Sequence, residues 1–143
     1  MKMILMLPPP PRGLDVNHGL GARWWKTRDV KQAHASAGVR AREAMLRAGI
    51  ARGEFHPRDV HIVTFWRGAH KDYDNALASC KAYQDAIFDK LGANDREIIC
   101  GASTLCHTET DAERGMVRYA LFDSWADFLL DLDEMMARGE GGR

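Results

Sequence analysis

Carboxylates gather in a short stretch near the middle of the chain. Asp72 and Asp74 stand two residues apart and are followed by Asn75, and a further acid, Asp95, comes after a turn at Gly92. Like charges repel one another unless a cation joins them, and hard oxygen ligands that leave room for water suit Mg²⁺ or Mn²⁺. A divalent ion held in this way performs phosphoryl transfer well, because it activates water and stabilises the leaving oxygen. The alternative is a solvated helix face with a carboxylate at its N-cap.

Residues 74–91 have the spacing of one amphipathic helix. With Asp74 at zero on a wheel of about 100° per residue, three further polar side chains fall within about 60° of it. These are Lys81, Asp85 and Asp89. The arc from roughly 180° to 320° is apolar, and it holds Leu77, Cys80, Tyr83, Ile87, Phe88 and Leu91. We expect Cys80 to be a buried thiol, and three carboxylates to meet if Asp95 folds back beside the start of this helix.

The elements around this stretch predict one α/β (α+β) domain. We expect a mixed sheet of about four to five strands, with two main helices packed on it and a C-terminal helix. Strands are predicted at 3–7, 60–66, 97–106 and 116–122, and the first main helix at 29–48. Strand 60–66 is rich in β-branched and aromatic residues, so it is expected to be central and to lead directly to Asp72. Strand 97–106 is expected to bulge near Gly101 and to pair with 116–122 as a hairpin.

The tail from Ser124 predicts an amphipathic helix that opens on a capping box with Asp127. Its apolar positions are Trp125, Phe128, Leu129, Leu132, Met135 and Met136, and its other face carries Asp131, Asp133 and Glu134. The helix either packs on the core of the domain or binds a second subunit, and core packing is favoured because tail helices commonly cover a sheet. Residues 138–143 are glycine-rich and are expected to fray.

Length and composition narrow the class of protein. The chain has 143 residues, of which 45% are hydrophobic and 28% charged, as in an ordinary globular domain. It lacks an apolar run long enough for a membrane helix and a signal-peptide pattern, so the expected location is the cytoplasm. Cys100, Cys106 and His107 lack the spacing of a common zinc site. We expect no zinc, no membrane partner and no nucleotide cofactor.

Charge is unevenly divided along the chain, although it sums to zero. Residues 1–71 hold 13 Lys and Arg against 5 Asp and Glu, a balance of +8, and residues 72–143 hold 7 against 15, a balance of −8. The basic half could supply a phosphate-binding surface beside an acidic centre, unless folding intermixes the charges. Candidate phosphate contacts are Arg23, Lys26, Arg28, Arg67 and Lys71. The Trp24–Trp25 pair among them either stacks on bases or packs within a loop.

The acidic stretch resembles the central motif of the RusA family of Holliday-junction resolvases. That motif runs D-x-D-N, then a lysine, an aspartate four residues later, and a D-D pair after a short turn. The matching residues here are Asp72, Asp74, Asn75, Lys81, Asp85, Gly92, Asn94 and Asp95. An apolar run that leads into prolines and an Asn-containing loop, at 7–17, also resembles the family. The likeness covers most of residues 4–122 and is sharp only within 70–98.

Two positions depart from the family pattern. The family usually places its lysine three residues after the asparagine, whereas Lys81 lies six residues after Asn75, nearly one helical turn further along the same acidic face. The first acid of the D-D pair is Asn94 here, which leaves Asp95 as the ionised member. The acidic tail helix has no counterpart in the family pattern.

The resemblance implies a homodimeric endodeoxyribonuclease that depends on Mg²⁺, with Mn²⁺ able to substitute. Such enzymes resolve four-way (Holliday) DNA junctions by paired nicks in recombination and repair. Residues 1–123 would form the nuclease domain, and residues 124–143 a helix and frayed tail in the same domain or at the dimer contact. The family's frequent association with phages suggests a phage or prophage origin.

The resemblance also assigns roles to single residues. Asp72, Asp74 and Asp95 would be the metal ligands and catalytic acids. Lys81 would contact the scissile phosphate or the charge that develops on it. Asp85 would assist with the metal or orient Lys81 from one turn away.

Other functions fit the same residues. A general branched-DNA or flap nuclease, or a phosphohydrolase of small molecules, would keep the metal and change the substrate. A non-catalytic junction-binding or scaffold protein would leave the acidic face solvated. Cleavage of a four-way junction, compared with a matched duplex, separates these possibilities.

Overall fold

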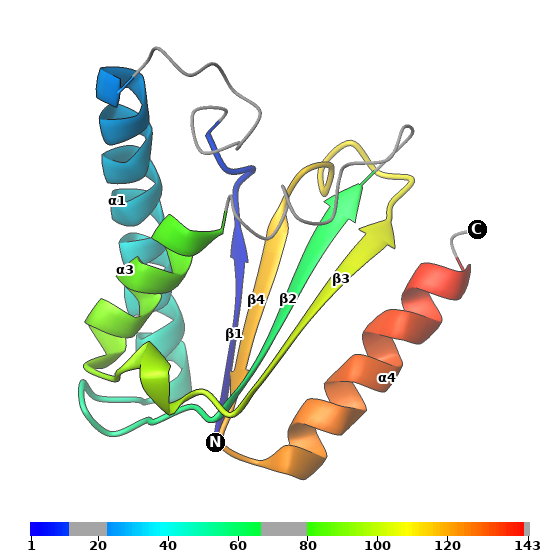
Figure 1. The fold of residues 1–143 in the computed structure, drawn as a ribbon. Helices are drawn as coiled ribbons and strands as arrows, with labels where there is room; N and C mark the ends of the chain where they lie inside the picture. Colours follow the sequence, from blue (N-terminus) through cyan, green and yellow to red (C-terminus); the bar gives the residue numbers. More distant parts are fainter. Residues whose placement is uncertain (12–22, 67–79, 142–143) are drawn as a thin grey trace.

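Four strands form one mixed sheet in the order β1-β4-β2-β3 (Figure 1). The structure, a computed structural model, describes residues 1–11, 23–66 and 80–141, and the side chains of all of these except 23–26 and 139–141. The strands are β1 Lys2–Leu7, β2 Asp59–Trp66, β3 Cys100–His107 and β4 Val117–Phe122. β1 and β2 run antiparallel to β4, and β3 runs parallel to β2. Within this part of the chain, one α+β domain forms from the sheet and three α-helices, as the sequence predicts.

β2 is the central strand, which confirms the prediction for 60–66. Both of its edges are paired, and all its residues but Trp66 are buried. Because side chains alternate along a strand, Val60 and Ile62 join the core beneath α1 and α3, while Val63 and Phe65 join a second cluster on the opposite face. The carboxyl end of β2 is followed in the sequence by residues 67–79, which include the predicted acidic pair, Asp72 and Asp74, and lie outside the described residues.

The predicted hairpin between the last two strands is wrong, because β2 lies between them. Periodicity predicts strands but not their partners, and the long connection 108–116 passes over the end of β2 instead of turning tightly. Its backbone is bonded there, from Thr108 N–H to Trp66 O at 2.7 Å and from Gly115 N–H to Phe65 O at 2.8 Å.

The predicted bulge near Gly101 is also wrong. Pairing between β2 and β3 is continuous, with Gly101 opposite Val60. The strand itself starts at Cys100 instead of Glu97, because Asp95–Glu97 form a 3₁₀ turn, η2.

α1 and α3 cover one face of the sheet (Figure 1). α1 spans Arg23–Ala48 and buries alanines at 33, 37, 41 and 44, whose small side chains allow close helix packing. The helix starts before the predicted residue 29, since no Gly or Pro interrupts 23–28. Trp24 and Trp25 are therefore helical, and the alternative that they belong to a loop is wrong.

α3 spans Lys81–Leu91 and buries the predicted apolar face. Tyr83, Ile87, Phe88 and Leu91 are buried in it, and Cys80, at its N-cap, is 2% exposed, as predicted. The described helix begins later than the predicted start near residue 74, and residues 72–79 lie outside the described part. It ends at Gly92, whose φ of 69° is the left-handed conformation that glycine adopts at low cost.

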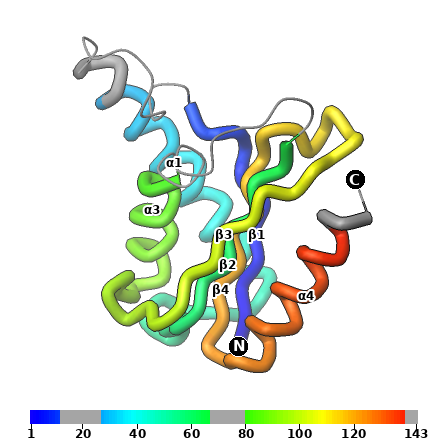
Figure 2. The backbone as a smooth tube through the Cα atoms, turned by 45° about the vertical axis from the view of Figure 1, so that its right-hand side comes forward, coloured from blue at the N-terminus to red at the C-terminus, as the bar shows by residue number. Residues whose placement is uncertain are grey.

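α4, Trp125–Gly141, covers the opposite face of the sheet (Figure 2). The Asp127 N–H approaches the Ser124 hydroxyl at 3.4 Å, and Phe128 packs edge-on against Phe122 with ring centroids 6.0 Å apart. Core packing of the tail helix is thus confirmed, and the helix extends to Gly141, into the region predicted to fray. Part of its predicted apolar face is nevertheless exposed, namely Trp125, Leu129 and Met136.

The prediction that Asp131 lies on the exposed polar face of α4 is wrong, because this residue is buried, at 5% exposure. Arg118 of β4 donates two hydrogen bonds to its carboxylate, at 2.9 and 2.5 Å. His61 Nδ1 lies 2.8 Å from Asp131 Oδ2, and His61 Nε2 lies 2.8 Å from the Thr104 hydroxyl. Since an ionised carboxylate only accepts, Nδ1 carries the imidazole proton and Thr104 donates to Nε2. This network joins α4 to three strands.

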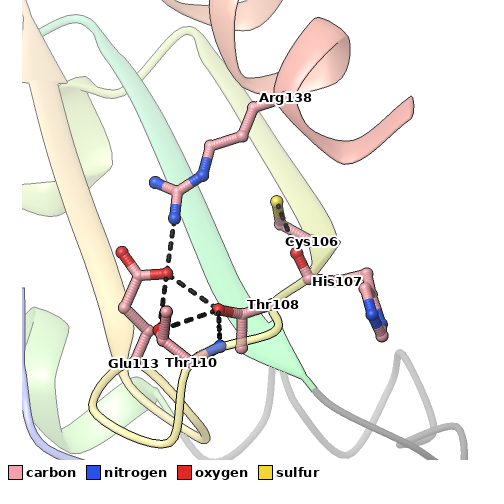
Figure 3. A network of polar contacts seen from close by, with 6 residues as sticks. All are labelled: Cys106, His107, Thr108, Thr110, Glu113 and Arg138. Atoms are coloured by element: carbon pink, nitrogen blue, oxygen red, sulfur yellow. Dashed lines mark hydrogen bonds and ion pairs between the residues drawn. The ribbon is translucent and has the colours of Figure 1, made fainter. Parts of the chain in front are cut away.

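A second polar network fastens the far end of α4 (Figure 3). Arg138 donates to Glu113 at 2.5 Å, and its guanidinium carbon lies 4.6 Å from the centre of the Phe65 ring. Thr108 donates to the same Glu113 carboxylate at 2.9 Å. These contacts hold the 108–116 connection against the helix.

Among the described helices, none combines the length and apolarity that crossing a membrane requires.

Candidate active site

The predicted site residues divide into two groups. Lys81, Asp85, Asp95 and Arg28 are described with their side chains. Asp72, Asp74, Arg67 and Lys71 lie outside the described residues, as do the side chains of Arg23 and Lys26. The meeting of Asp95 with the acidic pair therefore stays a prediction.

Asp95 lies beside the first half of α3, although it follows that helix in the sequence. After the Gly92 turn, the Asn94 side chain accepts the Arg96 N–H at 3.0 Å and caps η2. The chain thereby returns along α3, and the Gln84 amide donates to Asp95 Oδ2 at 3.3 Å. Because Gln84 lies one turn into the helix, Asp95 is held near the helix start.

A buried tyrosine on the sheet holds the side-chain amide of Gln84 in place. Tyr119 of β4 is 0% exposed and donates its hydroxyl to Gln84 Oε1 at 2.5 Å. Burial, followed by the nearby Cys80, Asp95 and Asp85, raises the pKa of Tyr119 well above its usual value. The hydroxyl therefore keeps its proton and donates, so Gln84 accepts through Oε1 and donates through Nε2.

Asp85 and Asp95 line one groove of about 490 Å³. Asp89, Glu97 and His56 share this lining, and His56 Nδ1 lies 3.5 Å from the Glu97 carboxylate. Among its described lining residues the groove carries four carboxylates and no Lys or Arg. Such a one-signed lining attracts cations.

Asp95 also borders a second hollow, of about 330 Å³, between α3 and strands β2 and β3. Its apolar walls include Val60, Ile62 and Ile98, and its polar groups are Gln84, Asp95 and Ser103. Asp95 thus belongs to both linings, with one side toward the acidic groove and the other toward an apolar hollow.

Lys81 and Asp85 form an ion pair on the exposed side of α3, with Lys81 Nζ 3.2 Å from Asp85 Oδ1. Their side chains are 72% and 49% exposed. This is the arrangement expected if Asp85 orients Lys81, and it places the lysine on the predicted acidic face. At this exposure the pair adds little to stability, roughly 0.3–0.5 kcal/mol.

The described carboxylates suit a hard cation, but they do not form a complete site. Within residues 1–11, 27–66 and 80–138, no three His, Cys, Asp or Glu side chains gather closely enough to hold a metal ion. Asp95 is half-buried, and its side chain accepts a bond from a neutral amide only, among the described residues. It therefore retains lone pairs for a metal. Mg²⁺ is commonly bound by one or two carboxylates with several waters, so the Asp95 carboxylate is chemically suited to be one ligand of such an ion.

Other candidate residues lie apart from this groove. Arg28, a predicted phosphate contact, is on α1, with its Nε 3.6 Å from Asp29. Cys106 and His107 are consecutive on β3, so their side chains point to opposite faces of the sheet. His107 lies 2.6 Å from Glu109 and Cys106 is fully buried.

Sequence reasoning missed Gln84 and Tyr119. On the wheel that places Asp74 at zero, Gln84 falls at about 280°, inside the apolar arc. A polar side chain at such a position needs a buried partner, and that was the available signal. Tyr119 gave no comparable signal, because an inward tyrosine in a strand is ordinary.

No protein-family model matches this chain, and no curated protein matches it significantly.

Proposed function

We propose that this chain is a Mg²⁺-dependent endodeoxyribonuclease that resolves four-way DNA junctions by paired nicks, acting as a homodimer. The observation that carries the proposal is the return of Asp95 to Gln84, at 3.3 Å, near the start of α3. Asp72 and Asp74 lie nine and seven residues before the start of α3 at Lys81. We therefore expect the acidic pair to meet the Asp95 carboxylate, which comes from beyond the helix.

The fold supplies rigid supports on both sides of the proposed site. β2, buried and paired on both edges, ends at Trp66, six residues before Asp72. α3 begins at Lys81, seven residues after Asp74. Chemistry-bearing residues are commonly placed on segments between rigid elements, and Asp95 returns to the same helix.

Each residue has a role in the proposed reaction. Asp72, Asp74 and Asp95 would hold the ion, which when bound supplies an activated water and stabilises the leaving oxygen. Lys81, turned to the acidic face by Asp85, would contact the scissile phosphate. Neutralising the phosphate in this way favours the approach of a nucleophile.

The proposed substrate explains the proposed symmetry. A four-way junction has two equivalent strands to cut, and an isologous dimer presents two equal sites to them. Arg23, Lys26 and Arg28 on the first turns of α1 are the proposed phosphate track, together with Arg67 and Lys71, which precede the acidic pair in the sequence. Contacts of this kind would make junction binding sensitive to salt.

The test is cleavage of a labelled static four-way junction with Mg²⁺, beside a duplex that has the sequence of two of its arms. We expect symmetrical paired nicks in the junction, no cutting of the duplex, and no cutting when EDTA removes the metal.

Three results would contradict the proposal in different ways. Equal cutting of duplex and junction would indicate a general nuclease. Junction binding without nicking at any Mg²⁺ or Mn²⁺ concentration would indicate a binding protein. Hydrolysis of a small phosphomonoester without DNA cutting would indicate a phosphohydrolase.

A further inference from the structure

Two successive hydrogen bonds connect the sheet to Asp95. Tyr119 on β4 donates to Gln84 on α3 at 2.5 Å, and Gln84 donates to Asp95 on η2 at 3.3 Å. The first donor is fully buried, and Gln84 and Asp95 are half-buried. The three side chains come from three elements, so their alignment fixes η2 against the sheet.

We propose that Gln84, held by Tyr119, is a positioning residue that orients the Asp95 carboxylate toward its divalent ion. This rests on the proposed function. Gln84 acts through Asp95 and is not itself a ligand. Outer partners of this kind commonly set the geometry of metal-binding carboxylates.

The residue type at position 84 supports this role. A Lys or Arg at this place would orient Asp95 but would also neutralise it and compete with a metal ion. The amide of Gln84 donates a hydrogen bond without adding charge, so it orients the Asp95 carboxylate without forming an ion pair with it. Among the described residues, Asp95 has no ion-pair partner.

Packing alone does not explain a glutamine here. Gln84 shares its helix arc with Tyr83, Ile87 and Leu91, all of them buried in the core. A methionine of similar length would fill the same space without needing partners. The amide end of Gln84 instead lies at the apolar hollow lined by Val60 and Ile62. Both of its hydrogen bonds, to Asp95 and from Tyr119, are made within the protein.

The experiment measures Mn²⁺ affinity of the full chain, without DNA, by electron paramagnetic resonance. Gln84→Met keeps the side-chain length and removes the donor, and we expect Mn²⁺ to bind about tenfold more weakly. Gln32→Met is the matched control, because Gln32 is an exposed glutamine on α1. The Mn²⁺ affinity of this variant should equal that of the unsubstituted chain.

Tyr119→Phe is the second variant, since it keeps the buried ring and frees the Gln84 amide to rotate. We expect weaker Mn²⁺ binding in the same direction, with the protein still folded by circular dichroism. If Gln84→Met fails to fold, Tyr119→Phe decides alone, and Mn²⁺ affinity within about twofold of the unsubstituted chain then overturns the proposal.

The outcomes separate this inference from the proposed nuclease. Unsubstituted protein that binds Mn²⁺, with folded Gln84→Met binding equally well, would overturn the positioning role and leave the nuclease standing. Unsubstituted protein that binds no Mn²⁺ and cuts no junction would overturn both.

Discussion

At the scale of single residues, Asp131 and Asp95 differ in the charge of their hydrogen-bond partners. Asp131 is buried and neutralised by a two-bond contact with Arg118. Asp95 is half-buried and accepts a hydrogen bond from the neutral amide of Gln84. A carboxylate stabilised by a cation within the protein is already satisfied, whereas one beside an amide can still bind a metal ion. This contrast separates the structural acid from the proposed catalytic one.

Asp95→Asn should lower the rate of junction cleavage by about 100-fold or more, because metal-assisted stabilisation contributes several kcal/mol to the transition state. The substitution preserves shape, so junction binding in Ca²⁺ should persist. Single-turnover cleavage and gel-shift assays measure the two quantities. Asp133→Asn, which alters an exposed acid on α4, is the control. Parallel loss of binding and cleavage would assign Asp95 to the fold.

Asp131→Asn should lower the free energy of unfolding by about 3 kcal/mol, because it leaves the charge of Arg118, whose side chain is only 11% exposed, without its partner. Urea denaturation measures the change, and Asp133→Asn again serves as the comparison. A loss as small as that of the control would show that the network contributes no stability.

At the scale of elements, the turn at Gly92 directs η2 back along α3. Gly92 has φ of 69°, and a Cβ added there would lie 2.9 Å from Arg52 Cγ. Gly92→Ala should therefore cost about 1–2 kcal/mol of stability. It should also weaken Mn²⁺ binding if the turn places Asp95.

Gly101→Ala is the matched control for the turn, because a Cβ at Gly101 meets nothing within 4 Å. Denaturation curves of the two variants provide the comparison. Equal stability of Gly92→Ala and Gly101→Ala would show that the left-handed turn is not required.

The sequence predicts local elements well and their pairing poorly, for physical reasons. Strand 60–66 and the buried face of the helix ending at Leu91 follow from periodicity, which is a local property. The position of β2 between β3 and β4 depends on pairing across the sheet, which no local pattern encodes. Asp131 was misplaced because its partners, Arg118 and His61, are distant in the sequence.

The candidate site shows the same limit. The acidic residues could be selected from their spacing and from family resemblance, and Asp85 and Lys81 occupy the helix face predicted for them. The contact of Asp95 with Gln84, and that of Gln84 with Tyr119, join residues 11 and 35 positions apart. Such contacts depend on the tertiary path through η2 and β4.

At the scale of the whole molecule, α1 and α3 cover one face of the sheet and α4 covers the other (Figure 2). The network of Asp131, Arg118 and His61 holds α4 against its face of the sheet. The stability of the folded protein should therefore depend on pH. Burial lowers the pKa of His61, only partly offset by its hydrogen bond to Asp131. Burial alone would raise the pKa of Asp131, but bonds from Arg118 and His61 outweigh it and lower that pKa.

Both shifts make the fold sensitive to acid. In the unfolded chain His61 takes up a proton near its ordinary pKa of 6.5, whereas in the folded protein its pKa is lower. The contribution of neutral His61 to the free energy of unfolding is therefore present above pH 6.5 and is lost as pH falls. Asp131 adds a further loss below its ordinary pKa of 3.8. Melting temperature should therefore decrease between about pH 7 and pH 5. His61→Gln should flatten this slope, and a melting temperature that rises toward pH 5 would contradict the assignment.

The central claim is that carboxylates from both sides of α3 meet around one divalent ion. The most direct measurement is a crystal structure with Mn²⁺, in which anomalous scattering locates the metal. The account predicts a manganese ion bound by Asp95 together with Asp72 or Asp74, with Gln84 still bonded to Asp95. A manganese ion bound elsewhere, with the Asp95 carboxylate out of reach of Asp72 and Asp74 in every copy, would contradict it.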